Sequence, residues 1–245
     1  MFVNRLSAIL FLAFFLSSTS APCSFAQSRK VLFREDFNNL DNWRTVNVSN
    51  KPEHTKYTIE RTNDGSYLKA ESNKSVLALA YKEEFNVYTY PKVRWRWKIS
   101  NIYKNADPET KDGDDYAIRV YVAFRYDPKA PSSIGQRLKY GLINTMYGEY
   151  PPQATLNYVW ANSENQKTIM TSPYSDTVKL IALEKGSKKV GTWQDEEIDI
   201  VQDYRKAFGA DAPQMGFVAV MNDSDNTGQS SVSYIDFIEV YGISE

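Results

Sequence analysis

A short acidic segment near the C-terminal end of the sequence has the composition of a calcium-binding loop. Residues 222–228 read Asn-Asp-Ser-Asp-Asn-Thr-Gly, and Ca²⁺ prefers several oxygen ligands held by one tight loop. An EF-hand is excluded, because its twelfth position would be Tyr234 instead of glutamate. The alternative is a metal-free turn in which Asp and Asn side chains bond to their own backbone. The candidate Ca²⁺ ligands are Asp223, Asp225, Thr227, Asp114 and Asp115.

Two other segments alternate strictly between apolar and polar residues, which is typical of half-buried strands. In 92–99, Arg94 and Arg96 fall on the polar face, opposite the tryptophans. In 115–125, Arg119 falls on the polar face. If the two strands are neighbours in one sheet, their cations share one surface. Those cations are Arg94, Arg96, Lys98, Arg119 and Arg125.

Such a surface has the chemistry to bind an anionic glycan. Arginine binds carboxylate, sulfate or phosphate through two parallel hydrogen bonds, and tyrosine offers a ring face to a sugar. The alternative is ion pairing with Asp115, Asp236 or Glu239, which would neutralise the surface. The candidate ligand-binding residues are Arg94, Arg96, Arg119, Tyr121, Asn157 and Trp160.

Four of the five tryptophans divide into two groups. Trp95 and Trp97 share the apolar face of their strand, so we expect them in the core. Trp160 ends an expected strand and Trp193 follows Gly191, which makes these two the better candidates for ligand contact.

The segment 195–202 is similar to the signature of laminarinase-type glycosidases, in which nucleophile and acid/base lie on one strand. Retaining hydrolysis needs two carboxyl groups roughly 5 Å apart. Glu197 and Asp199 match the first two positions of the signature, but the acid/base position holds Val201, or Gln202 if a bulge intervenes. Neither side chain donates a proton usefully, so we assign no catalytic residue and favour a protein that is not an enzyme.

The net charge restricts the class of binding partner, and the first residues indicate the cellular compartment. Among 245 residues, 29 are Lys or Arg and 30 are Asp or Glu, a net charge of −1, which disfavours nucleic acid as a partner. Residues 6–16 are apolar and 24–26 contain small residues, so 1–26 is predicted to be a secretory signal peptide, too short to span a membrane. We expect an exported protein, periplasmic or extracellular, without a transmembrane segment.

The single cysteine, Cys23, lies inside this predicted leader. Lipidation of Cys23 is disfavoured because Pro22 precedes it. Without the leader the chain has no cysteine, which excludes disulfides, thiolate catalysis and a Cys-ligated zinc. One histidine cannot build a zinc site either.

The remaining sequence predicts one all-β domain over 27–245, an antiparallel jelly-roll sandwich. An apolar residue at every fourth position predicts an inserted amphipathic helix over about 132–148, and a shorter helical turn is expected at 203–208, ending at Gly209. The expected strands are 31–33, 57–61, 67–71, 76–81, 92–99, 115–125, 154–160, 178–184, 196–201, 215–221 and 231–241.

Two resemblances support this fold. Residues 33–37 with Leu40 and Trp43, and residues 233–241, resemble the opening and closing strands of concanavalin-A-like jelly rolls. A wider resemblance over most of the chain is to an exported bacterial family catalogued as domain of unknown function 3047. The segments that carry it are 95–97, 113–116, 119–122, 157–160, 203–205, 208–209 and 223–228. This family implies no chemistry, and fold alone implies none.

These observations predict an exported, non-catalytic carbohydrate-binding protein for an anionic polysaccharide, with Ca²⁺ as a possible cofactor. The first alternative is a polysaccharide lyase or glycoside hydrolase of jelly-roll type, in which Arg119 would neutralise a uronate and Tyr121 would act as base. The second alternative is a structural envelope protein that binds another protein.

Overall fold

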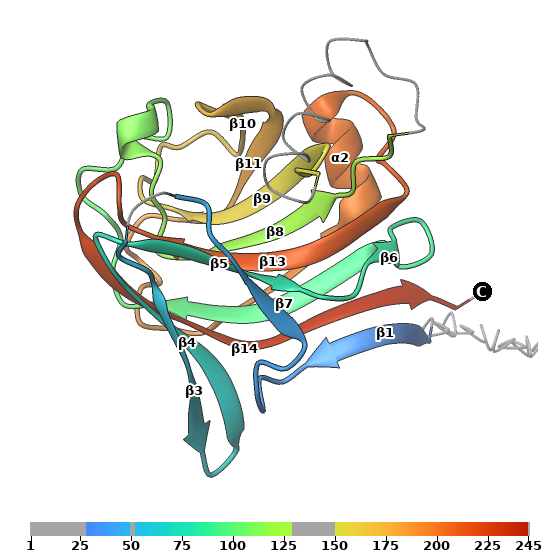
Figure 1. Cartoon of the computed structure of the whole chain (residues 1–245), viewed down its shortest axis with the longest axis horizontal. Helices are drawn as coiled ribbons and strands as arrows, with labels where there is room; N and C mark the ends of the chain where they lie inside the picture. Colours follow the sequence, from blue (N-terminus) through green and yellow to red (C-terminus); the bar gives the residue numbers. More distant parts are fainter. Residues whose placement is uncertain (1–27, 50–51, 129–149, 245) are drawn as a thin grey trace, which may run out of the picture.

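The computed structural model describes residues 28–49, 52–128 and 150–244, which form two packed β-sheets (Figure 1). The six-stranded sheet contains β1 (Arg29–Glu35), β3 (Lys56–Thr62), β4 (Gly65–Asn73), β7 (Lys92–Ile99), β12 (Gln194–Asp199) and β14 (Ser230–Ile243). The eight-stranded sheet contains β2 (Trp43–Val46), β5 (Val76–Tyr81), β6 (Phe85–Asn86), β8 (Arg119–Phe124), β9 (Ala154–Ala161), β10 (Ile169–Ser172), β11 (Ser175–Lys185) and β13 (Met215–Asp223). The helical elements are the 3-10 turn η1 (Lys111–Gly113) and the α-helix α2 (Ile200–Phe208).

The chain crosses repeatedly between the two sheets, as a jelly-roll sandwich requires. The strand order is β12-β7-β14-β4-β3 in one sheet, with β1 also paired to β14, and β10-β11-β9-β8-β13-β5-β2 in the other, with β6 paired to β13. The paired strands of the described residues are antiparallel, except that β9 and β11 are parallel. The predicted all-β sandwich is confirmed. The predicted leader and the predicted helix at 132–148 lie outside the described residues.

Strand β7 shows how the alternating pattern builds the core. Its residues alternate between half-buried and buried along the whole strand, as predicted. Trp95 and Trp97 point between the sheets, where their rings lie 5.7 Å from Tyr158 and 6.0 Å from Trp160 of β9. These contacts join the two sheets through large aromatic side chains, which bury more apolar surface than aliphatic ones.

The two ends of the described chain lie side by side, as the resemblance of both ends to jelly-roll strands implies. β1 runs antiparallel to β14 (Figure 1), with Val31 opposite Tyr241 and Glu35 opposite Ile238. The corner after β1 is fixed by the buried Glu35 carboxylate, which accepts hydrogen bonds from Phe37 N (2.7 Å) and Trp43 Nε1 (3.2 Å).

Three sequence expectations need correction. The strand expected over 115–125 begins only at Arg119, because the preceding residues form a loop that bonds to Asp223 and Asn226. The strand expected over 196–201 ends at Asp199, whose side chain caps α2 by accepting from Gln202 N at 2.9 Å. The short strands β2, β6 and β10 were not expected, because they carry too few residues to show a period.

The helical turn expected at 203–208 is confirmed as part of α2. Gly209 ends the helix in the left-handed conformation, with φ 68°, and donates to Arg205 O. No helix among residues 28–49, 52–128 and 150–244 is long and apolar enough to cross a bilayer.

Two carboxyl groups, one from each sheet, influence each other at one side of the sandwich. Glu196 of β12 points inward and accepts from Trp97 Nε1 at 3.2 Å, and Glu184 of β11 pairs with Lys189 at 2.7 Å. Burial and, to a smaller extent, the neighbouring Glu184 carboxylate raise the pKa of Glu196 to about 7, against the lowering effect of the hydrogen bond from Trp97. Glu196 therefore takes up a proton when the chain folds near neutral pH.

This proton uptake predicts a pH dependence of stability. Because the pKa of Glu196 is higher in the folded than in the unfolded chain, the free energy of unfolding falls as pH rises from about 4.5 to about 7. Urea denaturation across that range measures the fall. Glu196→Gln should reduce the slope, whereas the control Glu197→Gln, on the outer face, should not. An unchanged slope in Glu196→Gln would contradict the assignment.

Candidate functional site

The cations predicted to share one surface lie on two different sheets. β7 belongs to the six-stranded sheet and β8 to the eight-stranded sheet. Arg94 and Arg96 therefore lie on one outer face of the sandwich, and Arg119 and Tyr121 lie on the opposite one. The expectation of a single cationic surface is wrong, because a period of two shows which residues share a face of a strand but not which strands pair.

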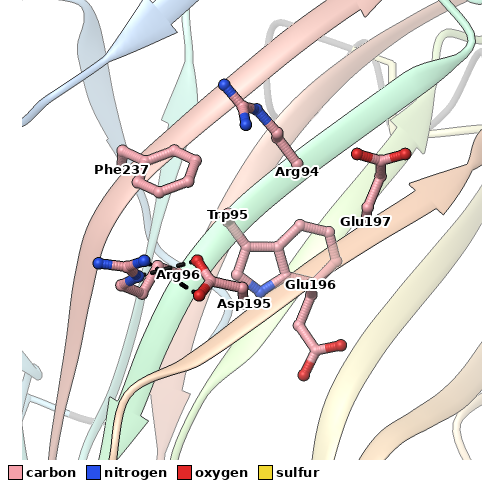
Figure 2. A pocket seen from close by; sticks show the side chains of 7 residues that line it. All are labelled: Arg94, Trp95, Arg96, Asp195, Glu196, Glu197 and Phe237. Carbon is pink, nitrogen blue, oxygen red and sulfur yellow. Dashed lines mark hydrogen bonds and ion pairs between the residues drawn. The ribbon is translucent and has the colours of Figure 1, made fainter.

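A pocket of about 340 Å³ opens on the outer face of the six-stranded sheet. Figure 2 shows its lining, which comes from β7, β12 and β14 and in which Asp195 of β12 points toward Arg96 of β7. The lining residues are Arg94, Trp95, Arg96, Asp195, Glu196, Glu197 and Phe237. Strand alternation directs the arginines, Asp195 and Glu197 outward, whereas Trp95 and Glu196 point inward.

Charged side chains in the pocket are paired with one another. Arg96 donates twice to Asp195, at 2.8 and 3.0 Å, and lies 3.6 Å from Asp236. Arg94 donates to Glu239 at 2.7 Å. These hydrogen bonds raise the pKa of both guanidinium groups and keep them charged. Burial acts to raise the pKa of Glu239, but its hydrogen bonds with Arg94 and Arg34 lower it overall. The expected alternative, ion pairing that neutralises the surface, is therefore present on this face.

Next to the pocket lies a cluster that we call the ring cluster: Tyr67, Trp193 and Tyr234. Trp193 lies 5.8 Å from Tyr67 and 6.3 Å from Tyr234 between ring centroids, and all three side chains are half-buried. The Lys98 ammonium lies over two of the rings, 4.7 Å from Trp193 and 4.6 Å from Tyr234. Trp193 was recognisable from the sequence as a ligand candidate. Its two tyrosine partners were not, because they come from β4 and β14, far away in the chain.

Trp160 is a core residue that packs between the sheets. It is 1% exposed, packs against Trp97, and donates from Nε1 to Gly186 O at 3.0 Å. The expected ligand contact of Trp160 is not supported by this position, because a ligand outside the sandwich cannot reach the ring.

Arg119 is buried in a network of acids on the outer face of the eight-stranded sheet. Its side chain is 4% exposed, and its Nε donates to Asp223 Oδ1 at 2.8 Å. The guanidinium also contacts Asp223 Oδ2, the Asp114 backbone oxygen and, at 3.4 Å, Asp114 Oδ1. The pKa of Arg119 lies well above its usual range, because both carboxylates outweigh the effect of burial. Arg119 is therefore committed to protein partners.

Tyr121 and Asn157 face each other across β8 and β9 on this same outer face. Burial raises the pKa of Tyr121 far above its ordinary value, and the Arg119 charge lowers it only in part. Tyr121 is thus poorly suited to act as a base. Asn157 is 1% exposed, and its Oδ1 has no hydrogen-bond partner in the described part of the chain.

The acidic loop is brought together with the earlier acidic stretch, as predicted. Carboxylate oxygens of Asp115, Asp223 and Asp225 lie within 4.8 Å of one another. Asp115 accepts from the backbone of Asn226 at 3.4 Å and of Thr227 at 2.6 Å, and the Thr227 hydroxyl has no partner among the described residues. Burial raises the pKa of Asp223 to about 7, against the lowering effect of Arg119. Asp114 lies apart from this group and bonds to Arg119 and Ser172.

Two carboxylates of the glycosidase-like segment have other positions. Asp199 caps α2 and pairs with Lys92 at 3.2 Å, whereas Glu197 lies in the pocket on the outer face. The two positions matched to the signature, Glu197 and Asp199, are therefore not held together at the pocket, where Glu197 lies beside Asp195 instead.

The fold and its surfaces define a two-sheet β-sandwich protein with a charged and aromatic outer face. The chain belongs to the family described as "Protein of unknown function (DUF3047)", which matches residues 41–239. The resemblance found in the sequence is thereby confirmed. No curated protein matches the sequence significantly.

Several solved structures are similar in fold at low identity. The glycoside hydrolase domain of Endo-D from Streptococcus pneumoniae R6 matches with a TM-score of 0.35 and 11% identity, over 81% of this chain, which spans 21% of that one. Endoglucanase 3 of family GH12 from Trichoderma harzianum matches with a TM-score of 0.45 and 10% identity. The match covers 90% of this chain and 99% of the endoglucanase. The winged bean acidic lectin matches with a TM-score of 0.34 and 13% identity. The match covers 83% of this chain and 100% of the lectin. The site described above rests on the geometry of this chain alone.

The contrast between Arg119 and Arg96 predicts different effects on stability. Arg119→Ala leaves two buried carboxylates without their cation, so the free energy of unfolding should fall by about 3–5 kcal/mol. Arg96→Ala removes a pair whose side chains are 41% and 61% exposed, which should cost about 1 kcal/mol or less. Urea denaturation measures both values. Equal losses for the two variants would show that the Arg119 network does not hold the fold.

Proposed function

We propose that this protein is an exported, non-catalytic carbohydrate-binding protein that holds an anionic polysaccharide on the outer face of the six-stranded sheet. The observation that carries the proposal is the pocket beside the ring cluster. A surface that combines half-exposed aromatic rings with paired, outward-facing arginines and carboxylates offers both apolar contact and hydrogen bonding to one ligand.

The polar groups of the pocket fit a ligand rich in hydroxyl groups. A hydroxyl both donates and accepts, so it can bond to an arginine and a carboxylate at once. Arg96 and Asp195 present both kinds of group side by side, and the Asp195 side chain is 61% exposed. The buried Phe237 ring lies beneath the Arg34 guanidinium at 4.0 Å and beneath that of Arg94 at 5.5 Å, so it supports the arginines from below.

The geometry favours binding over cleavage. The lyase arrangement would need Arg119 to reach a uronate, yet this side chain is buried and paired on the opposite sheet. The carboxyl in β12 whose pKa is raised, Glu196, points between the sheets and away from the pocket wall formed by Asp195 and Glu197. Among the described residues, therefore, no carboxyl group with a raised pKa points into the pocket to act as a general acid.

The proposal predicts retention on acidic polysaccharides that depends on the pocket. Affinity electrophoresis of the purified protein in polygalacturonate, alginate and neutral dextran gels measures it. Arg96→Ala should weaken binding at least tenfold, because it removes the donor pair and frees Asp195 as an uncompensated negative charge. Arg205→Ala is the control, because it breaks another solvent-exposed arginine–aspartate pair, with Asp211, that lies outside this pocket. Equal retention of both variants would contradict this site, and retention by no polysaccharide would contradict the function.

We also propose that the acidic loop binds Ca²⁺ as a structural ion. Asp115, Asp225 and the Thr227 hydroxyl would hold it, with Asp223 shared between the ion and Arg119. These are hard oxygen donors, which match the preference of Ca²⁺.

This calcium proposal predicts stabilisation by mass action. Millimolar Ca²⁺ should raise the Tm of the chelator-treated protein, because a ligand that binds only the folded chain stabilises it. Asp225→Asn should abolish the increase, whereas Asp64→Asn, in the exposed turn between β3 and β4, should preserve it. A Tm that does not respond to Ca²⁺ would mean that the loop is the metal-free turn.

A further inference from the structure

One lysine on the outer face of β7 differs from the other cations of that strand. The strand carries Lys92, Arg94, Arg96 and Lys98 on this face. The first three lie 3.2, 2.7 and 2.8 Å from the carboxylates of Asp199, Glu239 and Asp195. Within the described residues no carboxylate comes within ion-pair distance of Lys98, whose ammonium lies over Trp193 and Tyr234 instead.

Aromatic rings hold a cation without cancelling its charge. The attraction between an ammonium and a ring face is worth roughly 0.5–1 kcal/mol at exposed sites, and it orders the lysine side chain. A flexible lysine loses up to about 2 kcal/mol of rotamer entropy when it is fixed. Because the rings have already fixed Lys98, an incoming anion would meet an ordered and uncompensated positive charge.

The rings of the cluster are steeply inclined to one another. The interplanar angles are 68° between Tyr67 and Trp193, 81° between Tyr67 and Tyr234, and 64° between Trp193 and Tyr234. Rings arranged in this way form a corner and not a flat strip. A corner suits one sugar ring better than several units of a chain lying flat.

The ring cluster lies next to the pocket along the same two strands. Arg96 is paired in register with Phe237, and Lys98 with Tyr234. Two residues along a strand span about 7 Å, so a ligand of a few sugar units can reach both places. The arginines in the pocket are compensated by carboxylates, and Lys98 is not. The ring cluster therefore carries a positive charge without a paired carboxylate, whereas the arginines of the pocket are each paired with one.

We propose that Lys98, Trp193 and Tyr234, with Tyr67 at their side, form a subsite for a single sugar unit that carries an anionic group. The carboxylate or sulfate of the unit pairs with the Lys98 ammonium, and the C–H groups of its ring contact the aromatic corner. The pocket beside it takes the neighbouring uncharged hydroxyls. This inference rests on the proposed glycan binding on this face and identifies the residue that selects acidic over neutral glycans.

The test compares ligands that differ only in charge. Isothermal titration calorimetry at 0.15 M salt measures binding of the purified protein to polygalacturonate and its methyl ester, and to dextran sulfate and dextran. The wild-type protein should prefer the acidic member of at least one pair tenfold or more. Lys98→Met keeps an apolar stem over the rings but removes the charge, so the preference should fall to about one. Lys98→Arg should restore it.

Two further variants separate charge from folding and from non-specific attraction. Lys104→Met removes the same charge from an exposed lysine after β7 and should keep the preference. Trp193→Ala should weaken binding to both members of a pair. Which pair shows the preference distinguishes a carboxylate from a sulfate.

A preference that survives Lys98→Met, or equal binding to both members of each pair, would overturn the subsite while glycan binding on this face stands. A wild-type protein that binds none of the four polymers would overturn the proposed function and the subsite with it.

Discussion

The two-residue alternation of β7 places core residues on one face of the strand and surface residues on the other, so one backbone positions both. One face of the strand carries Trp95 and Trp97, which connect the sheets, and the other carries Arg96 and Lys98. A shift of one residue in register would exchange the two faces and place the indoles in water. Because β12 and β14 pair with β7 on either side, the outer side chains are positioned by a backbone that the core fixes. The positions of the outer side chains of β7 are thus set by the packing of its inner side chains in the core.

The sequence was sufficient for local structure and for the residues near each other in one strand. The alternation in β7, the bounds of β5 and the cap glycine of α2 follow from patterns within short segments. The sequence was insufficient wherever two strands had to be placed in the same sheet. β7 and β8 show the same period, but their strand partners depend on contacts between residues far apart in the chain, which no local pattern encodes.

Arginines with the same sequence pattern have opposite physical roles. Arg119 is enclosed by acids in a network where the loss of solvation must be offset by partners, whereas Arg96 keeps contact with water. A sequence shows only that each alternates with apolar neighbours. Burial decides the role, and it depends on the loop before β8 that packs against β13. For the same reason Lys98 was not singled out, since its contact with Trp193 and Tyr234, without an ion pair to any described carboxylate, results from segments that meet only in the folded chain.

The position of β14 has a consequence for the order in which the molecule assembles. This C-terminal strand lies in the middle of its sheet, between β7 and β4, and also pairs with β1. The three earlier strands have no common neighbour until the last part of the chain is available. Contacts over such sequence separations form slowly, and unpaired strand edges can meanwhile pair with other chains. Because β14 follows β13 in the chain, the six-stranded sheet cannot be completed before every strand of the eight-stranded sheet has been synthesised, and its folding depends on keeping those edges from pairing with other chains until then.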